Sequence, residues 1–258
     1  MTASTVVLWR HGQTDWNATG RYQGQGDVPL NDAGLAQART VAPVLAAYCP
    51  ARIVSSDLSR ALQTAEILGE LTGVRVEPMP GLQEINVGTW VGLTNEEVFE
   101  LSPDFKQALR EGRDFRRSDT GETGSEAGSR VATTLLDAAE ATPDGETLLA
   151  VGHGFSLRVA ITLLMGLDFA HNRLFSGLWN CAWTVMQPAG DHWRLQAYNH
   201  HIPTWAPRSE PTTSADGSGR RPRAVSARCQ AWPSRTSEPI PVRAARGGYP
   251  SPTSVVPS

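Results

Sequence analysis

The stretch VVLWRHGQTDWN, residues 6–17, begins as an apolar, β-rich run and stops at the tripeptide RHG, residues 10–12. A second run of this kind, ETLLAVG at residues 146–152, is followed by HG at residues 153–154. Short apolar runs that end in glycine-bearing turns are typical of buried strands. The pattern predicts two central strands, each with a histidine at its carboxyl end.

Helical patterns alternate with these strands. The run SDLSRALQTAEILGELTG, residues 56–73, places apolar side chains at helical spacing behind an N-cap at Ser56 or Asp57. Further helices are predicted at residues 31–48, 125–141 and 155–166, and a final hairpin at residues 181–199. This alternation predicts an α/β fold: a three-layer sandwich whose central sheet is mostly parallel and flanked by helices. Ligands of such sheets bind beyond the carboxyl ends of the strands.

Composition and charge exclude several function classes. The 258 residues carry a formal net charge of -3, so no global basic field favours nucleic acid or an anionic membrane as partner. No run approaches the roughly 18 apolar residues of a membrane span, and no basic segment followed by a long apolar run begins the sequence. The cytoplasm is the expected compartment, and local cations must capture any anionic substrate.

The composition changes near Trp205. From there to residue 258 the chain holds nine of its eighteen prolines, eight arginines and no lysine, without an apolar period. Such a segment buries too little surface to offset the entropy of ordering it. The sequence therefore predicts a folded domain at residues 1–204 and a disordered Pro/Ser/Arg-rich tail at residues 205–258.

Four cationic or cationisable side chains are expected at one rim of the sheet: Arg10, His11, Arg60 and His153. Their mutual repulsion requires a counter-charge, and phosphate is the simplest one. Arginine presents a planar fork of donors that matches phosphate oxygens. A neutral imidazole at His11 can attack phosphorus and divide one hard displacement into two easier ones. No acidic cluster with metal-ligand spacing accompanies these residues, so we expect neither a metal ion nor another cofactor.

A leaving alkoxide also needs a proton. The glycine-rich segment GLQEINVGTWVGL, residues 81–93, follows a strand-like run and contains a single acid, Glu84. Within a pocket, Glu84 can act first as general acid and then as base on the attacking water.

Four blocks of the sequence together resemble the histidine phosphatase superfamily, also called phosphoglycerate mutase-like. They are LWRHGQTDWN, SSDLSRALQTAEIL, LQEINVGTWVGLT and AVGHG, and the resemblance covers about residues 4–200. It implies that His11 is phosphorylated, that Arg10 and Arg60 clamp the phosphate, and that His153 is a second catalytic histidine that also contacts the phosphoryl group. By the same resemblance Glu84 is the proton donor, and Asn17 and Gln23 contact the phosphoryl group or nearby substrate.

The sequence departs from the family pattern at the substrate rim. Gln83 and Val91 stand where arginine and glutamate are frequent, and a Gly-Glu-Ser segment appears in altered form as TGETGSEAGS, residues 120–129. These departures put substrate specificity in doubt and leave the phosphate chemistry intact. A small cap beside the substrate site is expected at about residues 94–124, and the sequence there predicts one or two small helices.

The short cap favours hydrolysis of the phosphohistidine over return of its phosphoryl group to a substrate. The expected function is therefore metal-independent hydrolysis of a small-molecule phosphate monoester through a phosphohistidine. The sequence is especially similar to glucosyl-3-phosphoglycerate phosphatases and broad-specificity relatives, which suggests glucosyl-3-phosphoglycerate or another sugar or glycerate phosphate as substrate. Two alternatives remain open: a cofactor-dependent phosphoglycerate mutase and a non-catalytic module that binds phospholigands. A homodimer also remains open.

Overall fold

The opening apolar run forms β1 (Thr5–Arg10), near the middle of a six-stranded sheet with the order β3-β2-β4-β1-β5-β6. The computed structural model describes residues 2–202. The other strands are β2 (Pro50–Ser55), β3 (Val76–Pro78), β4 (Thr147–Gly152), β5 (Trp183–Ala189) and β6 (His192–His200). Strands β3, β2, β4 and β1 are mutually parallel, whereas the β5–β6 hairpin adds antiparallel strands at one edge. The predicted α/β class, mostly parallel sheet and final hairpin are confirmed.

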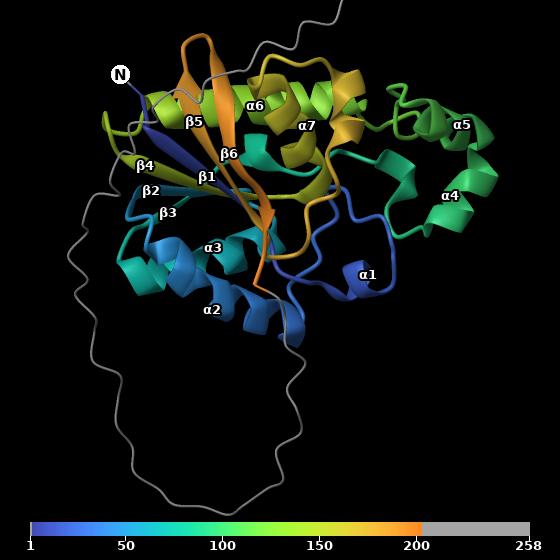
Figure 1. The fold of residues 1–258 in the computed structure, drawn as a ribbon. Helices are drawn as coiled ribbons and strands as arrows, with labels where there is room; N and C mark the ends of the chain where they lie inside the picture. Colours follow the sequence, from blue (N-terminus) through green and yellow to red (C-terminus); the bar gives the residue numbers. More distant parts are fainter. Residues whose placement is uncertain (1, 203–258) are drawn as a thin grey trace, which may run out of the picture. The chain divides into compact units, whose positions relative to one another are not determined.

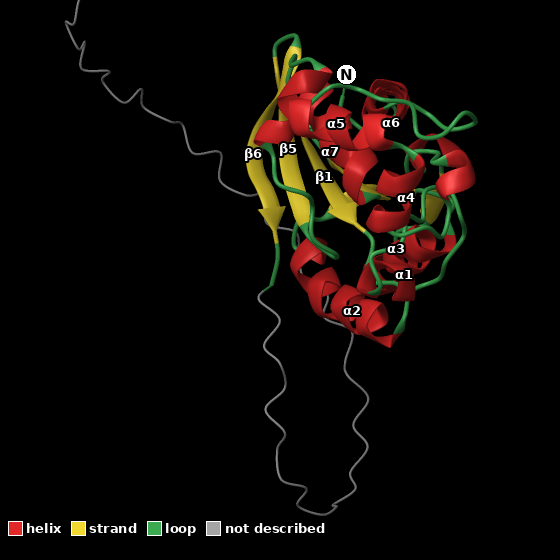
Figure 2. Cartoon of the chain, turned by 90° about the vertical axis from the view of Figure 1, so that its right-hand side faces the viewer, coloured by secondary structure: helices red, strands yellow, loops and turns green. Residues whose placement is uncertain are grey.

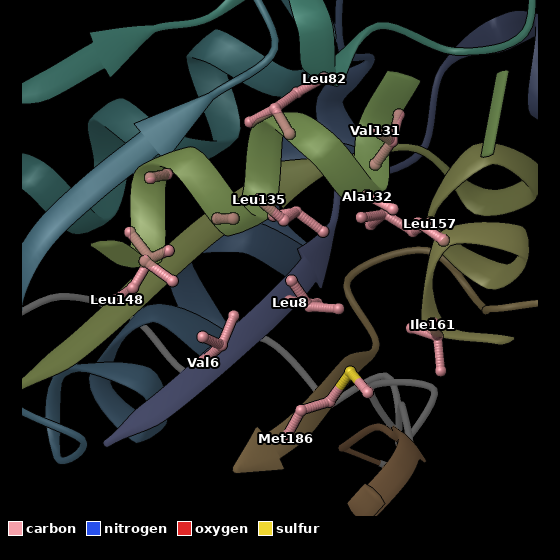
Figure 3. Close-up of a cluster of buried hydrophobic side chains, with 14 of the residues drawn as sticks. Val6, Leu8, Leu82, Val131, Ala132, Leu135, Leu148, Leu157, Ile161 and Met186 are labelled. Atoms are coloured by element: carbon pink, nitrogen blue, oxygen red, sulfur yellow. The ribbon is translucent and has the colours of Figure 1, made fainter. Parts of the chain in front are cut away.

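Helices cover both faces of this sheet. Figure 1 shows α2 (Asp32–Ala46) and α3 (Ser59–Thr72) on one face, and α6 (Gly124–Glu140) and α7 (Gly154–Leu164) on the other. The central strand β1 is therefore buried on both sides. Val7 and Trp9 pack toward α2 and α3, while Val6 and Leu8 pack toward α6 and α7, in the cluster drawn in Figure 3. Removal of this much apolar surface from water holds the three layers together.

A third apolar cluster belongs to the cap. The helices α4 (Asn95–Leu101) and α5 (Pro103–Glu111) lie to one side of the sheet, as Figures 1 and 2 show. Val98 and Phe105 from these helices pack on Ile85, Val87 and Trp90. The short elements around them are α1 (Asp15–Ala18) and 3-10 turns at Pro80–Leu82, Gly88–Trp90 and Phe169–Leu174. Both cap helices lie within the segment where the sequence suggested one or two.

One predicted helix start is wrong. The N-cap residue of α3 is Leu58, whose side chain makes no capping bond, and neither Ser56 nor Asp57 takes that place. Instead Asp27, from a distant loop, accepts hydrogen bonds from the backbone and the hydroxyl of Ser59. Tertiary contacts thus replaced the local cap, and Ser56 is used elsewhere.

Helix α2 lies within the range that the sequence predicts, residues 31–48. Asn31 caps α2 through its side chain, and α2 continues as one helix through Pro43. The proposed tail at residues 205–258 lies outside the described residues. Within residues 2–202, none of the helices combines the length and the apolarity that a membrane crossing requires.

Candidate active site

A cavity of about 260 Å³ lies at the carboxyl end of β1, between the rim of the sheet and the cap. It is lined by six of the seven predicted site residues: Arg10, His11, Asn17, Gln23, Arg60 and Glu84. The seventh, His153, is fully buried beside them, and its ring centroid lies 5.1 Å from that of His11. The structure therefore gathers side chains that are more than 140 positions apart in the sequence.

His11 presents one free ring nitrogen. Its Nδ1 lies 2.6 Å from the carbonyl oxygen of Gly12, which can only accept, so Nδ1 carries the proton and Nε2 keeps its lone pair. Burial, assisted by Arg10 and Arg60, lowers the pKa of His11 well below its usual range. The ring is therefore a neutral imidazole, and its Nε2 has no hydrogen-bond partner among residues 2–202.

Two arginines, the partly buried Arg10 and the buried Arg60, lie near His11, and neither forms an ion pair with a carboxylate of residues 2–202. Arg60 is fully buried and donates to the carbonyl oxygens of Gly26 and Gly24 at 2.8 and 2.7 Å, while Arg10 donates to Leu178. Within residues 2–202, neither Nε atom has a hydrogen-bond partner. Burial lowers the pKa of Arg60 to about 10, so it remains charged at neutral pH. Two desolvated cations with spare donors form an anion site.

The two amide side chains are oriented by neighbours. The Oδ1 of Asn17 accepts from the backbone N–H of Thr14 and from Asn180, each at 3.1 Å. The Oε1 of Gln23 accepts from the Thr14 hydroxyl at 3.1 Å. Both carbonyl oxygens are therefore occupied, and each amide keeps its NH₂ group available as a donor to a ligand.

Glu84 lies at the amino end of α7. Its carboxylate accepts hydrogen bonds from the backbone N–H groups of Ser156 at 2.8 Å and Phe155 at 3.1 Å, and from that of Ile85 at 2.9 Å. Backbone donors and the positive end of the helix dipole are a favourable environment for a carboxylate. These bonds fix the acid at the wall of the cavity.

Close packing explains two glycines of the motifs. A Cβ atom at Gly12 would lie 2.5 Å from the carbonyl oxygen of Gly34 in α2. A Cβ atom at Gly154 would lie 3.0 Å from Nε of Arg10. Both distances are shorter than normal contacts, so glycine lets the backbone reach the anion site at both strand ends.

Comparison with known proteins decides the family. The family model described as histidine phosphatase superfamily (branch 1) matches residues 6–201. The chain belongs to this superfamily. The predicted resemblance is thus confirmed, and so is the expected enzyme class, a phosphatase.

This histidine phosphatase is similar to several characterised or named proteins. It is 33% identical to the glucosyl-3-phosphoglycerate phosphatase of Mycobacterium tuberculosis over 214 residues, which cover 77% of this chain and 96% of the relative. It is 37% identical to a probable phosphoglycerate mutase of Yersinia pestis over 180 residues, 69% of this chain and 81% of the relative. A solved structure of the mycobacterial glucosyl-3-phosphoglycerate phosphatase with VO3 is 33% identical and superimposes with a TM-score of 0.71, covering 76% of this chain and 98% of that one.

A serine missed by the sequence analysis orients the second histidine. The hydroxyl of Ser56 lies 2.8 Å from Nε2 of His153, and it also accepts from the backbone N–H of Leu58 at 3.3 Å. If Ser56 donates to Nε2, then His153 carries its proton on Nδ1, an atom that is buried without a partner in the described part of the chain. Burial, together with the positive charge of Arg60, lowers the pKa of His153 well below its usual range, so its ring is also neutral.

Replacement of Ser56 by alanine is expected to lower kcat/KM by about 10- to 100-fold, because the tautomer of His153 loses its support. Ser55 supplies a matched control: it is equally buried, and its hydroxyl donates to the backbone oxygen of Ser56, its one side-chain hydrogen bond among residues 2–202. Steady-state kinetics of S56A and S55A check this expectation. Equal losses in the two variants would contradict the role given to Ser56.

The cap side of the cavity carries residues that the sequence analysis did not identify. Arg117 and Arg158 line it together with Phe105 and Phe155. The guanidinium carbon of Arg117 lies 4.5 Å from the ring centroid of Phe105 and 5.2 Å from that of Phe155, and Arg158 lies 5.5 Å from the Phe155 ring. Cations stacked on aromatic faces are partly stabilised without a carboxylate. The sequence signal was the arginine pair in FRRS at residues 115–118, which adds positive charge to the cap.

Proposed function

We propose that this histidine phosphatase hydrolyses small phosphate monoesters through a phosphohistidine at His11, with arginines in the place of a metal ion. One observation carries the proposal: a neutral His11, whose Nε2 has no hydrogen-bond partner among residues 2–202, lies near the guanidinium groups of Arg10 and Arg60, and neither of these makes an ion pair within the same residues. Such a site attracts a dianion and presents a nucleophile to its phosphorus atom. Arg10, Arg60, Asn17, Gln23 and His153 are the proposed phosphoryl ligands.

In the first half-reaction, the Nε2–phosphorus bond forms while the ester phosphorus–oxygen bond breaks. The departing alkoxide takes a proton from the carboxyl of Glu84. The cations and the Nδ1–H of His153 stabilise the charge on the transferring phosphoryl oxygens. This step leaves phosphohistidine, free alcohol and an ionised Glu84.

In the second half-reaction, Glu84 accepts a proton from water as the water oxygen attacks phosphorus. The phosphorus–nitrogen bond breaks, its electron pair returns to Nε2, and inorganic phosphate leaves. The enzyme is restored with Glu84 protonated and His11 neutral.

The cap side of the cavity supports a substrate with a second negative group. Arg117 is 5% exposed, and the only acceptor of its guanidinium group among residues 2–202 is the backbone oxygen of Phe115. A buried guanidinium without a carboxylate favours an anionic ligand. We therefore propose a phosphoglycerate or a glycosylated phosphoglycerate, whose carboxylate Arg117 and Arg158 would contact. The named mycobacterial phosphatase supports the same substrate class.

Replacement of Arg117 by glutamine is expected to lower kcat/KM for 3-phosphoglycerate by about 10- to 100-fold, because a hydrogen bond to a charged group is lost. Activity on glycerol 3-phosphate, which lacks the carboxylate, is expected to change far less. Arg116 is the control, since it pairs with Glu126 and does not line the cavity. Comparison of both substrates with R117Q and R116Q gives the measurement, and a uniform loss on both would refute the carboxylate contact.

The function itself is tested by release of inorganic phosphate in the presence of a chelator, across sugar phosphates, phosphoglycerates and glucosyl-3-phosphoglycerate. The similarity to a named mutase makes phosphoglycerate mutase the second candidate. Incubation with 3-phosphoglycerate, with and without 2,3-bisphosphoglycerate, separates the two. Isomerisation that requires the bisphosphate would replace the phosphatase proposal. Phosphate binding without turnover of any substrate would instead favour the non-catalytic module.

A further inference from the structure

We propose that Arg130 is a positioning residue for Glu84: it holds the loop that places this acid, although it does not line the cavity. The inference rests on the proposed function, because Glu84 is taken as the proton donor. Arg130 lies on α6, and its hydrogen bonds to the site run through the backbone of residues 81–84. Burial is the main cause of the lowered pKa of His153, and the positive charge of Arg130 also contributes to it.

The guanidinium of Arg130 uses every donor it has. It donates to the backbone oxygens of Gly81 at 3.0 Å, Gln83 at 2.9 Å and Glu84 at 3.2 Å. Its Nε and Nη2 also donate to the carboxylate of Glu122, at 3.0 and 2.8 Å. An arginine side chain has five N–H groups in a rigid fork, so these five bonds exhaust it. A lysine ammonium cannot reproduce this set.

Glu122 and Arg130 together form a clamp on the Glu84 loop, in which Glu122 holds the chain on the other side of Glu84. Besides pairing with Arg130, its Oε2 accepts from the backbone N–H of Asn86 at 2.8 Å. Its own backbone N–H donates to the carbonyl oxygen of Asn86, also at 2.8 Å. The ion pair therefore binds the main chain on both sides of Glu84. Glu122 belongs to the altered segment TGETGSEAGS, so this departure from the family pattern retains an acid with a structural contact to the site loop.

The loop needs such support because no regular ladder holds it. Glu84 lies between two 3-10 turns, Pro80–Leu82 and Gly88–Trp90, outside any strand or helix. A proton donor displaced by about 1 Å can lose a hundredfold in rate. Arg130 and Glu122 are only partly exposed, at 26% and 22% of their side-chain surfaces, so their pairing is less screened by water than a surface pair.

The test exploits the leaving group. A departing p-nitrophenolate is stable without a proton, whereas the alkoxide of glycerol 3-phosphate needs one. The kcat/KM ratio of the two substrates reports the step up to phosphohistidine formation, and it does not depend on how much of the enzyme is active. R130Q is expected to lower the glycerol 3-phosphate value about 10- to 100-fold and the p-nitrophenyl phosphate value only a few-fold. R130K should give an intermediate ratio.

Two further variants calibrate this result. E84Q removes the proton donor itself and is expected to change the ratio at least as much as R130Q. R52Q is the matched control: Arg52 makes a similar two-bond pair with Glu77 and donates to the backbone of Ala138, and neither partner belongs to residues 81–84. It should leave the ratio unchanged even if the protein is destabilised.

The outcomes separate the two proposals. A changed ratio in E84Q with a wild-type ratio in R130Q overturns the positioning role of Arg130. An unchanged ratio in E84Q instead removes Glu84 as proton donor, and with it the proposed mechanism. If R130Q does not fold, E122Q carries the same test, because it weakens the clamp while it keeps the shape of the side chain, and a wild-type ratio there also overturns the inference.

Discussion

Replacement of His11 by alanine is expected to abolish phosphate release almost completely, with a loss of about 10⁴-fold or more. The remaining cations should still bind phosphate, but among residues 2–202 no other nucleophile stands beside the anion site: the second imidazole, His153, has its Nε2 engaged by Ser56. Without a covalent intermediate, water must displace the alcohol directly, and phosphate monoesters are among the slowest substrates to do so. Steady-state assays on p-nitrophenyl phosphate measure the loss.

The same variant tests the intermediate. Wild-type enzyme quenched during turnover of labelled substrate should carry acid-labile phosphate on the protein, and H11A should carry none. His192 is the control, since it lies exposed in the β5–β6 hairpin and its ring contacts Asp191. H192A is expected to behave as wild type in both measurements. Normal turnover by H11A would rule out the phosphohistidine mechanism.

The sequence predicted those site residues well that come directly after a strand. Both RHG at residues 10–12 and HG at residues 153–154 come directly after buried apolar runs, and parallel strands end at a common edge. The register Arg10↔Gly152 between β1 and β4 places these turns side by side. Strand periodicity and the ligand rule for α/β sheets were therefore sufficient to bring His11 and His153 together.

Residues that act through tertiary contacts were not predictable in the same way. Ser56 looks like a helix cap in the sequence, but in the structure Asp27 supports the start of α3, and Ser56 bonds His153. Arg130 is one of several polar residues on α6, and only the fold brings it to the Glu84 loop. The local sequence pattern around Ser56 or Arg130 does not predict these hydrogen-bond partners, because the partners come from distant segments of the chain.

Arg60 shows how strongly the site depends on one buried charge. Its two terminal nitrogens hold the backbone of Gly24 and Gly26, next to Gln23, and its unpartnered Nε adds positive charge beside His11. It therefore shapes the loop that carries Gln23 and also attracts the anion. The absence of a carboxylate pair within residues 2–202 leaves this charge for the ligand.

Replacement of Arg60 by lysine is expected to lower kcat by about 10²- to 10³-fold, because an ammonium keeps the charge but loses the fork of donors that stabilises the transferring phosphoryl group. The two carbonyls that Arg60 now satisfies should also destabilise the fold by about 1–3 kcal/mol when they lose a donor. Kinetics and urea denaturation of R60K measure the two effects separately. The exposed Arg39 on α2 is the control.

Binding of inorganic phosphate gives the third measurement on R60K. In the wild-type protein, phosphate binds the folded state and should raise the unfolding temperature by an amount that grows with the logarithm of one plus the ratio of the phosphate concentration to Kd. R60K should show a much smaller shift at equal phosphate concentration, whereas R39K should retain it. A full phosphate shift in R60K, together with kcat within tenfold of wild type, would mean that the anion is held by Arg10 and the amides without Arg60. We expect R60K to lose phosphate binding because lysine has no planar pair of donors. Its ammonium group cannot replace the two terminal nitrogens of Arg60, which hold the carbonyl groups of Gly24 and Gly26 in place.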